Sequence, residues 1–135
     1  MSVYNIEARE FNVKLAAELQ KIPEFKTASW VFLVKSGSHK ERIPEDADFW
    51  YKRAASILRF MYTQNKPLGV SRLRTRYGGK KDRGVRPSEF RKSGGKMIRL
   101  LLQQAEAAGL IEKTKSGRAG RMLTEKGRKL LEGIK

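Results

Sequence analysis

Residues 110–127 read LIEKTKSGRAGRMLTEKG, and no other stretch of the chain says as much about its architecture. The apolar start over 110–113 predicts a short strand, and a basic turn over 115–120 follows it. Residues 121–123 can return as a second strand. Thr124 is a residue type that caps helices, so a helix is expected to begin directly after it. The stretch predicts a β-hairpin that leads into a final helix.

Helices are expected on both sides of this hairpin. Before it, apolar and polar residues recur at helical spacing over about 96–108, and Gly109 suits the position that follows a helix. The apolar face comprises Ile98, Leu101, Leu102, Ala105 and Ala108, and the polar stripe comprises Lys96, Arg99, Gln103 and Glu106. The final helix carries Leu130, Leu131 and Ile134. The order helix, strand, basic turn, strand, helix is that of a winged-helix domain, with residues 114–120 as the wing.

A longer helix is predicted from about Asp48 to Thr63, and it is mostly apolar. One side carries Trp50, Ala54, Ile57 and Met61, and the adjoining side carries Tyr51, Ala55, Leu58 and Tyr62. The narrow polar stripe comprises Lys52, Ser56, Arg59 and Thr63. A helix with so wide an apolar arc is buried by several neighbours. The expected fold is therefore mainly α, a winged-helix-like helical bundle around this central helix with a small β-hairpin wing.

Arg53 lies away from the polar stripe of the central helix, beside Phe49 and Phe60. An unpaired buried charge is expensive, so a cation at this position needs a partner. Two hypotheses remain open. Arg53 pairs with a carboxylate or carbonyl in the core, or it emerges at a surface that faces a binding partner.

The N-terminal third contains another predicted helix, over residues 6–22. Its apolar positions are Ala8, Phe11, Leu15, Leu19 and Ile22. Asn5 is the expected N-cap, and Pro23 is expected to stop the helix. The apolar run over 28–35 is either a buried strand or a short helix, because periodicity does not separate the two at this length.

The positive charge of the chain is large and unevenly placed. The 135 residues fit one domain over 1–135, with 30 Lys and Arg against 14 Asp and Glu and a net charge of +16. Such an excess of positive charge indicates a polyanionic partner, and nucleic acid is favoured over an anionic membrane surface. Residues 66–99 hold 12 basic and 2 acidic side chains, a net charge of +10. The same segment holds six glycines: Gly69, Gly78, Gly79, Gly84, Gly94 and Gly95.

Within this basic segment a short helix over 71–77, capped by Ser71, is favoured over a strand. A loop over 78–87 is expected to follow it. Glycines let backbone amides approach an anion, and Arg and Lys neutralise it. The segment is therefore expected to contact phosphates.

Composition excludes several other classes of site. The chain has no cysteine and one histidine, His39, so thiolate and multi-histidine metal sites are impossible and no cofactor is expected. The longest apolar run, over 30–34, is far shorter than the ~20 residues that cross a bilayer. No signal peptide is visible at the N-terminus, so a cytosolic protein is expected.

No residue pattern supports catalysis. The carboxylates over 41–48 precede the central helix, where they are expected to stabilise the helix N-terminus rather than to exchange protons. Gly79 and Gly84 have the spacing of a nucleotide-binding loop, but the Lys and the hydroxyl that such a loop needs are missing. His39 is expected to be a surface or phosphate contact, because nothing nearby would orient it as a base.

Five motifs follow one another across nearly the whole chain. They are HKER at 39–42, FWYKRAASILR at 49–59, YGG at 77–79, GVRPS with Phe90 at 84–90, and GR-x-LT-x-x-G at 120–127. In order and spacing they resemble the ribosomal protein S19e family of archaea and eukaryotes. Because the chain ends at Lys135 without the longer tail of eukaryotic members, the archaeal type is expected.

The resemblance implies a structural, rRNA-binding component of the head of the small ribosomal subunit, partnered by other small-subunit proteins. It also implies a part in small-subunit maturation and pre-rRNA processing. Arg53 and Arg59 would fall in an RNA-linked central helix, and Gly78, Gly79 and Arg86 in an RNA-facing loop. With the basic segment, the candidate RNA-binding residues are Arg53, Arg59, Arg72, Arg74, Arg76, Gly78, Gly79, Lys80, Lys81, Arg83, Arg86, Arg91, Lys92, Lys96 and Arg99. No catalytic residue, metal or membrane partner is expected, and the free chain is expected to be a monomer.

A winged-helix DNA-binding regulator is the alternative. Such a regulator places a recognition helix in the major groove and dimerises to read two half-sites. Here the charge is concentrated in a glycine-rich segment, which suits irregular RNA better than a regular duplex.

Overall fold

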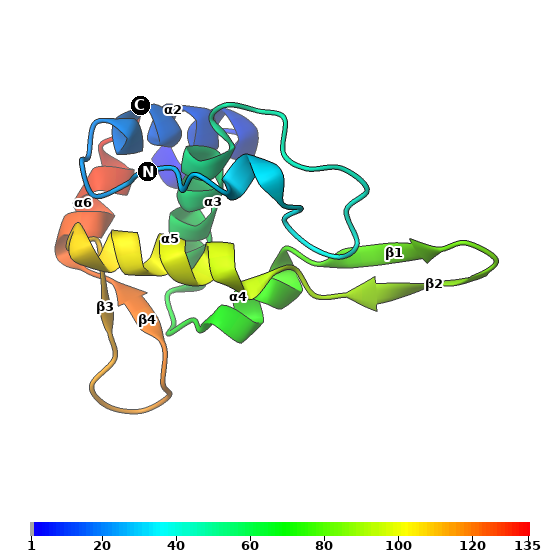
Figure 1. The fold of residues 1–135 in the computed structure, drawn as a ribbon. Coiled ribbons are helices and arrows are strands. Elements are labelled where there is room, and N and C mark those ends of the chain that lie inside the picture. The colour runs from blue at the N-terminus through cyan, green and yellow to red at the C-terminus, as the bar shows by residue number, and fades with distance from the viewer. Residues whose placement is uncertain (1) are drawn as a thin grey trace.

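The computed structural model describes residues 2–135, and Figure 1 shows a helical body from which two hairpins project. In these residues the α-helices are α1 (Ser2–Asn5), α2 (Ala8–Gln20), α3 (Phe49–Gln64), α4 (Val70–Arg76), α5 (Gly95–Ala107) and α6 (Glu125–Glu132). A 3-10 helix, η1, spans Val31–Leu33. The strands are β1 (Gly79–Arg83), β2 (Arg86–Arg91), β3 (Ile111–Lys113) and β4 (Arg121–Leu123). The expectation of a mainly helical, winged-helix-like fold is confirmed.

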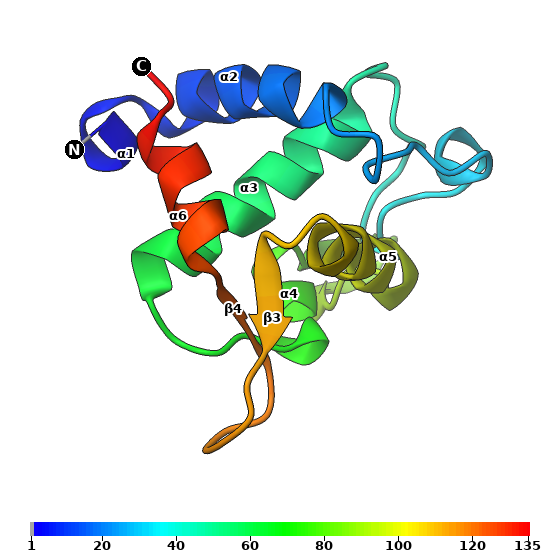
Figure 2. The same ribbon diagram turned by 90° about the vertical axis from the view of Figure 1, so that its left-hand side faces the viewer.

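Helix α3 is the central element, as its wide apolar arc predicts. Figure 2 shows it crossing the body between α2, α5 and α6. Trp50, Ala54, Ile57 and Met61 are all 2% exposed or less. The Trp50 indole donates a hydrogen bond of 2.9 Å to the side-chain oxygen of Gln104, so even the polar atom of this buried ring is satisfied and α3 is fixed to α5.

The N-terminal helix differs from the prediction for residues 6–22. The chain first forms α1, turns, and then forms α2, so Asn5 lies inside α1 and Glu7 occupies the N-cap position without a side-chain cap bond. The turn brings Val3 into the core, where it is fully buried. Phe11, Leu15 and Leu19 are buried as predicted, whereas Ala8 is exposed.

The apolar run over 28–35 is not a buried strand. It contains the short helix η1, in which Val31 is buried while Leu33 is 77% exposed. A strand would place these two residues on the same face. The short-helix alternative is therefore the correct one, in 3-10 form.

The winged-helix half follows the sequence closely. Strands β3 and β4 pair antiparallel, with Ile111 opposite Leu123. The Thr124 hydroxyl accepts a hydrogen bond of 3.3 Å from the Gly127 amide and so caps α6. Gly109 follows α5 with a φ of 76°, which suits glycine.

Helix α4 confirms the short helix expected after the central one, but with a different start. It begins at Val70, with Gly69 in extended backbone at the N-cap position and no side-chain cap bond. Ser71 is therefore not the cap.

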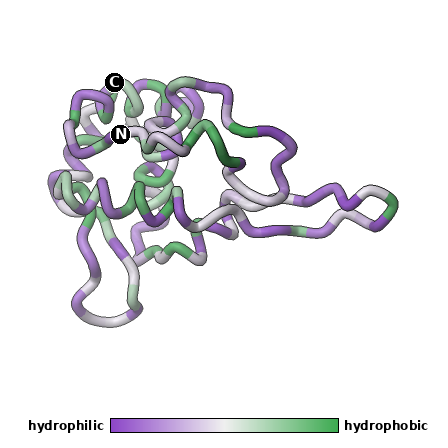
Figure 3. Tube along the Cα trace, viewed as in Figure 1, coloured by the Kyte–Doolittle hydropathy of each residue, from purple (hydrophilic) through white to green (hydrophobic). Residues whose placement is uncertain are grey.

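The loop expected over 78–87 is wrong, because β1 and β2 form an antiparallel hairpin there. Gly79 pairs with Arg91, Lys80 with Phe90 and Lys81 with Glu89. The Asp82 carboxylate accepts a hydrogen bond from the Gly84 amide, and Gly84 has a φ of 73°. The turn is therefore stabilised by an Asp side chain and by a glycine in the left-handed region. Figure 3 shows both arms of the hairpin as mainly hydrophilic. A strand without apolar alternation carries no period-two signal, which is why the sequence did not predict it.

Candidate nucleic-acid interface

The β1–β2 hairpin is held to the body through contacts between α3 and the end of α4. The Arg53 guanidinium lies 4.2 Å from the ring centre of Tyr77 and 5.2 Å from that of Phe49. The hydroxyls of Ser56 and Tyr77 are 2.7 Å apart and share a hydrogen bond. Arg76 lies over the Phe60 ring at 4.2 Å. One face of α3 therefore fixes the segment that leads into β1.

The contacts of Arg53 differ from both hypotheses, which were a carboxylate or carbonyl partner in the core and a surface that faces a binding partner. Its partners are aromatic rings, which attract a cation through their negative faces. Burial lowers the pKa of the Arg53 guanidinium from its ordinary value and raises that of the Tyr77 phenol. In this structure Arg53 positions Tyr77 and, through it, the hairpin.

The segment that follows β2, at the base of the hairpin, is fixed by the loop before α3 and by α4. The Ser36 carbonyl accepts a hydrogen bond of 2.9 Å from the Gly94 amide, and Gly37 bridges to Ser93. Arg74 donates from Nε to the Ser93 carbonyl at 2.9 Å. Both ends of the hairpin thus leave the body at defined positions.

Two of the candidate glycines make room for packing at the hairpin base. A Cβ on Gly78 would lie 2.5 Å from the Arg91 carbonyl oxygen, closer than real contacts allow. A Cβ on Gly79 would lie 3.0 Å from the His39 ring, and one on Gly37 would lie 2.7 Å from it. His39 is therefore wedged between two glycines, partly buried, and is not a free surface residue.

The cations of the hairpin fall into two groups. Arg83 and Arg91 both pair with Glu89, at 3.0 and 3.1 Å, and Arg83 also donates to the Pro87 carbonyl. Lys80, Arg86 and Lys92 are exposed and pair with no carboxylate in the described chain, and Lys81 is half-buried without such a pair. Glu89 stiffens the arm, and the unpaired cations remain available to an anion.

The candidates on α4 and α5 also divide. Arg72 and Arg99 are exposed, and Lys96 is exposed with its ammonium 4.7 Å from the Trp30 ring centre. Arg74 is committed to Ser93, as described, and Arg76 covers Phe60.

Arg59 lies apart from this group. It is partly buried, donates from Nη2 to the Val3 carbonyl at 3.4 Å and sits 5.9 Å from the Phe11 ring centre. Its Nε is buried without a hydrogen-bond partner among the described residues. The structure therefore places Arg59 against the N-terminal segment, away from the hairpin.

The wing adds cations that the candidate set omits. Lys113, Lys115 and Arg118 are all exposed on β3 and the turn that follows it. The predicted wing over 114–120 is the sequence signal that could have included Lys115 and Arg118.

Comparison with known proteins identifies the family of the chain. The sequence model of the family described as Ribosomal protein S19e matches residues 2–135. The chain belongs to the S19e family. It is 49% identical to the small ribosomal subunit protein eS19 of Aeropyrum pernix over 113 residues, which cover 84% of this chain and 72% of that protein. It is 39% identical to eS19A of Schizosaccharomyces pombe over 134 residues, covering 99% of this chain and 91% of that protein. It is 41% identical to eS19G of Ascaris suum over 133 residues, covering 98% and 88% of the two chains.

S19e is a family of ribosomal proteins and not of enzymes. Two of the carboxylates before α3, those of Asp46 and Asp48, make contacts within the fold. Lys52 pairs with Asp46, Asp46 accepts a hydrogen bond from the Asp48 amide, and Asp48 accepts one from Gln20. The hydrogen bond from Lys52 lowers the pKa of the Asp46 carboxyl most. Asp48 holds the N-cap position, but its carboxylate binds Gln20 and not the helix amides, so the capping expected there is wrong in detail.

Residues 2–135 contain no cluster of three or more His, Cys, Asp or Glu that could hold a metal ion. None of the helices in the same residues is long and apolar enough to cross a bilayer.

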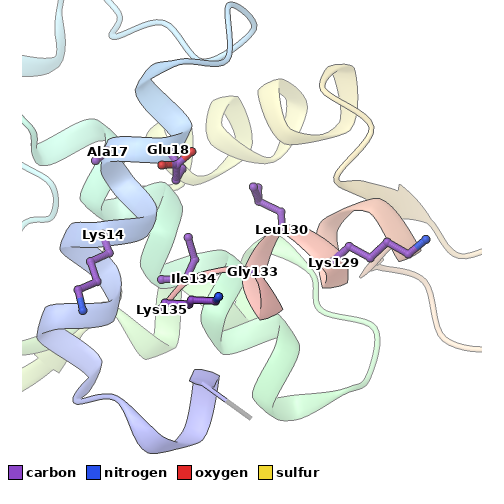
Figure 4. A pocket seen from close by; sticks show the side chains of 8 residues that line it. All are labelled: Lys14, Ala17, Glu18, Lys129, Leu130, Gly133, Ile134 and Lys135. Atoms are coloured by element: carbon purple, nitrogen blue, oxygen red, sulfur yellow. The ribbon is translucent and has the colours of Figure 1, made fainter.

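A cavity of about 540 Å³ lies between α2 and α6, at the other end of the molecule from the β1–β2 hairpin (Figure 4). Leu130 and Ile134 line it, together with Lys14, Glu18 and Lys129. Lys14 already pairs with Glu10 at 2.6 Å and Glu18 with Lys21 at 2.8 Å. Lys129 and Lys135, which also line the cavity, have no ion pair among the described residues, so two of its four charged side chains are paired within the chain.

Proposed function

We propose that this S19e protein is a structural component of the small-subunit head that binds rRNA through the β1–β2 hairpin and the adjoining faces of α4 and α5. It acts within cytoplasmic ribosomes, beside other small-subunit proteins, as one domain that is monomeric when free. Its contribution to subunit maturation and pre-rRNA processing is that of a scaffold, which orders RNA without reacting with it.

The observation that supports this proposal most strongly is the exposed, basic β1–β2 hairpin. All six residues of β2 are exposed, so the arm buries little apolar surface of its own. Isolated two-stranded hairpins are marginal in water. A projecting arm of this kind, with unpaired Lys80 and Arg86, is suited to a partner that surrounds it and supplies negative charge.

The hairpin also favours RNA over duplex DNA. A winged-helix regulator would use a recognition helix and its wing in regular grooves. Here the projecting arm with the most cations is the β1–β2 hairpin, which lies outside the winged-helix half (Figure 1). Membership of a ribosomal protein family supports the same choice.

The test compares two triple variants of equal charge. Lys80, Lys81 and Arg86 changed to Ser should lower the slope of log affinity for small-subunit rRNA against log salt by about 2 to 3, since each phosphate contributes roughly 0.7–0.9. Lys14, Lys21 and Lys26 changed to Ser is the control, because these residues lie on α2 and the following loop. The hairpin variant should also fail to co-sediment with small subunits in cell lysate. Equal losses in the two variants would mean that net charge alone drives binding, and the proposal would be wrong.

A further inference from the structure

A second feature of the basic region is a cavity of about 320 Å³ between the C-terminal end of α3 and α4. Phe60 and Gln64, one turn apart on α3, form one wall, and Arg72 and Arg76, one turn apart on α4, form the other. Lys66 and Leu68 close it from the connecting segment. Its volume falls within the ~300–1,000 Å³ of pockets that take small ligands.

The charges of this cavity are unbalanced. Lys66, Arg72 and Arg76 are exposed cations, and none of them has a carboxylate within ion-pair distance in the described residues. No acidic residue lines the cavity. The site is therefore built to receive negative charge.

The cavity also offers a flat stacking surface. The Arg76 guanidinium lies 4.2 Å from the centre of the partly buried Phe60 ring. Nucleobases stack on aromatic rings and on arginine planes. The Gln64 amide both donates and accepts hydrogen bonds, which matches the edge of a base. Leu68 is 1% exposed, so the cavity presents little aliphatic surface to an apolar side chain of a protein partner.

The position of the cavity connects it to the two projecting hairpins. Arg76 is the last residue of α4, three residues before β1 begins at Gly79. Leu68 exchanges two backbone hydrogen bonds of 3.0 Å with Arg121, the first residue of β4 in the wing. Figure 1 shows α4 between the bases of the two hairpins. A strand of RNA that contacts both arms would pass over this site.

We propose that the cavity formed by Phe60, Gln64, Lys66, Arg72 and Arg76 binds one unpaired nucleotide of the RNA, with its base stacked on the Arg76–Phe60 pair and its phosphate beside Lys66 and Arg72. The proposal rests on the proposed RNA-binding function. It adds a single-nucleotide pocket to the basic interface proposed above.

The first experiment follows backbone and arginine side-chain NMR signals of the full chain during titration with adenosine 5′-monophosphate, adenosine, inorganic phosphate and a hexaglutamate peptide. The nucleotide should shift Phe60, Gln64 and Arg76 signals at lower concentration than any of the other three probes. If inorganic phosphate or hexaglutamate acts at the same concentration, the site is a general anion site and the proposal is overturned.

Two variants remove the stacking surface without changing charge. Phe60→Leu and Arg76→Lys should each weaken nucleotide binding by about fivefold or more, since stacking on one base contributes roughly 1–3 kcal/mol. Phe32→Leu is the matched control, because Phe32 is also partly buried but lies in η1, and it should leave nucleotide affinity unchanged. Thermal melting establishes that each variant is folded. Arg76 is exposed, so Arg76→Lys keeps the test decisive if Phe60→Leu is unstable.

The same variants separate this proposal from the proposed function. Phe60→Leu should lower affinity for small-subunit rRNA by a similar factor while leaving the salt slope intact, because it removes no cation. If it leaves rRNA affinity unchanged while the Lys80, Lys81 and Arg86 variant loses its salt slope, the hairpin binds RNA and the nucleotide pocket is wrong. If the hairpin variant binds rRNA normally, the proposed function fails whatever the pocket does.

Discussion

Arg53 shows how a residue of the central helix acts on a distant part of the chain. Its guanidinium stacks against Phe49 on its own helix and Tyr77 at the end of α4. Both contacts use the planar guanidinium, which a long aliphatic stem carries to the rings. Arg53 is therefore a residue on which the attachment of the hairpin depends.

Replacing Arg53 with Ala should lower the free energy of unfolding by about 1–3 kcal/mol, because two cation–aromatic contacts and the packing of the stem are lost. The stability of Arg53→Lys should lie between that of the wild type and that of Arg53→Ala, since lysine keeps the positive charge but lacks the planar guanidinium. Urea unfolding followed by circular dichroism measures both. Lys52→Ala, which removes a surface pair with Asp46, should cost less than about 1 kcal/mol. Equal effects of Arg53→Ala and Lys52→Ala would contradict the structural role.

His39 makes stability depend on pH. Burial, and then the charges of Lys40 and Arg53, lower the pKa of its imidazole from the ordinary value. The unfolded chain then binds a proton at higher pH than the folded chain does, so stability falls as pH decreases below ~6.5, the ordinary histidine pKa, toward the lower folded value. The urea midpoint should drop between about pH 7.5 and 5.5, and His39→Gln should remove most of that drop. The same pH dependence in wild type and variant would show that His39 does not titrate differently on folding.

At the scale of elements, the β1–β2 hairpin depends on its base more than on its own packing. Every residue of β2 is exposed, while a Cβ on Gly78 would meet the backbone of β2 and Ser93 is bonded to both Gly37 and Arg74. A side chain added to a glycine at the base should therefore loosen the whole hairpin. A side chain added to a glycine with open space around it should not.

Gly78→Ser should destabilise the protein by about 1–3 kcal/mol, the usual cost of overpacking, because its Cβ would meet the Arg91 carbonyl at 2.5 Å. Gly69→Ser is the matched control. A Cβ there meets nothing within 4 Å, and Ser is a good residue at the N-cap position that Gly69 occupies. Amide hydrogen exchange in β1 and β2 should accelerate in Gly78→Ser alone. Unchanged exchange would mean that the base tolerates a side chain.

At the scale of the whole molecule, one core joins the N-terminal helices to the winged-helix half. It extends from Val3 and Phe11 through the buried face of α3 to Leu101 on α5 and Leu131 on α6. Because α3 contributes seven buried residues to this core, damage to its buried face should remove the fold as a whole.

Ala54→Glu tests that dependence. Ala54 is 2% exposed, and a carboxylate placed there would be buried without a partner, so cooperative thermal melting should be lost. Ala107→Glu makes the same change at an exposed position of α5 and should melt within a few degrees of wild type, since surface substitutions usually stay within about 0.5 kcal/mol. A normal melt for Ala54→Glu would show that α3 is not the centre of the core.

The amino-acid sequence by itself determined those features that depend on local pattern. The buried face of α3, the apolar face of α5, the wing strands and the Thr124 cap were all predicted, and the structure confirms them. Each depends on residues that are close together in the chain, where helical spacing, strand alternation and capping chemistry leave a readable signal. The net charge likewise indicated a polyanionic partner before any element was placed.

Tertiary structure alone decided the features that join distant residues. Lys80 faces Phe90 across the hairpin through backbone bonds, Arg53 meets Tyr77, and Arg59 meets Val3. The β1–β2 hairpin pairs through backbone hydrogen bonds and β2 buries no face, so its side chains carry no alternating pattern, and the ring or carbonyl that a cation contacts depends on which one the packing brings near it. The nucleotide cavity arises in the same way, because Phe60 and Arg76 face each other only once α4 has packed against α3.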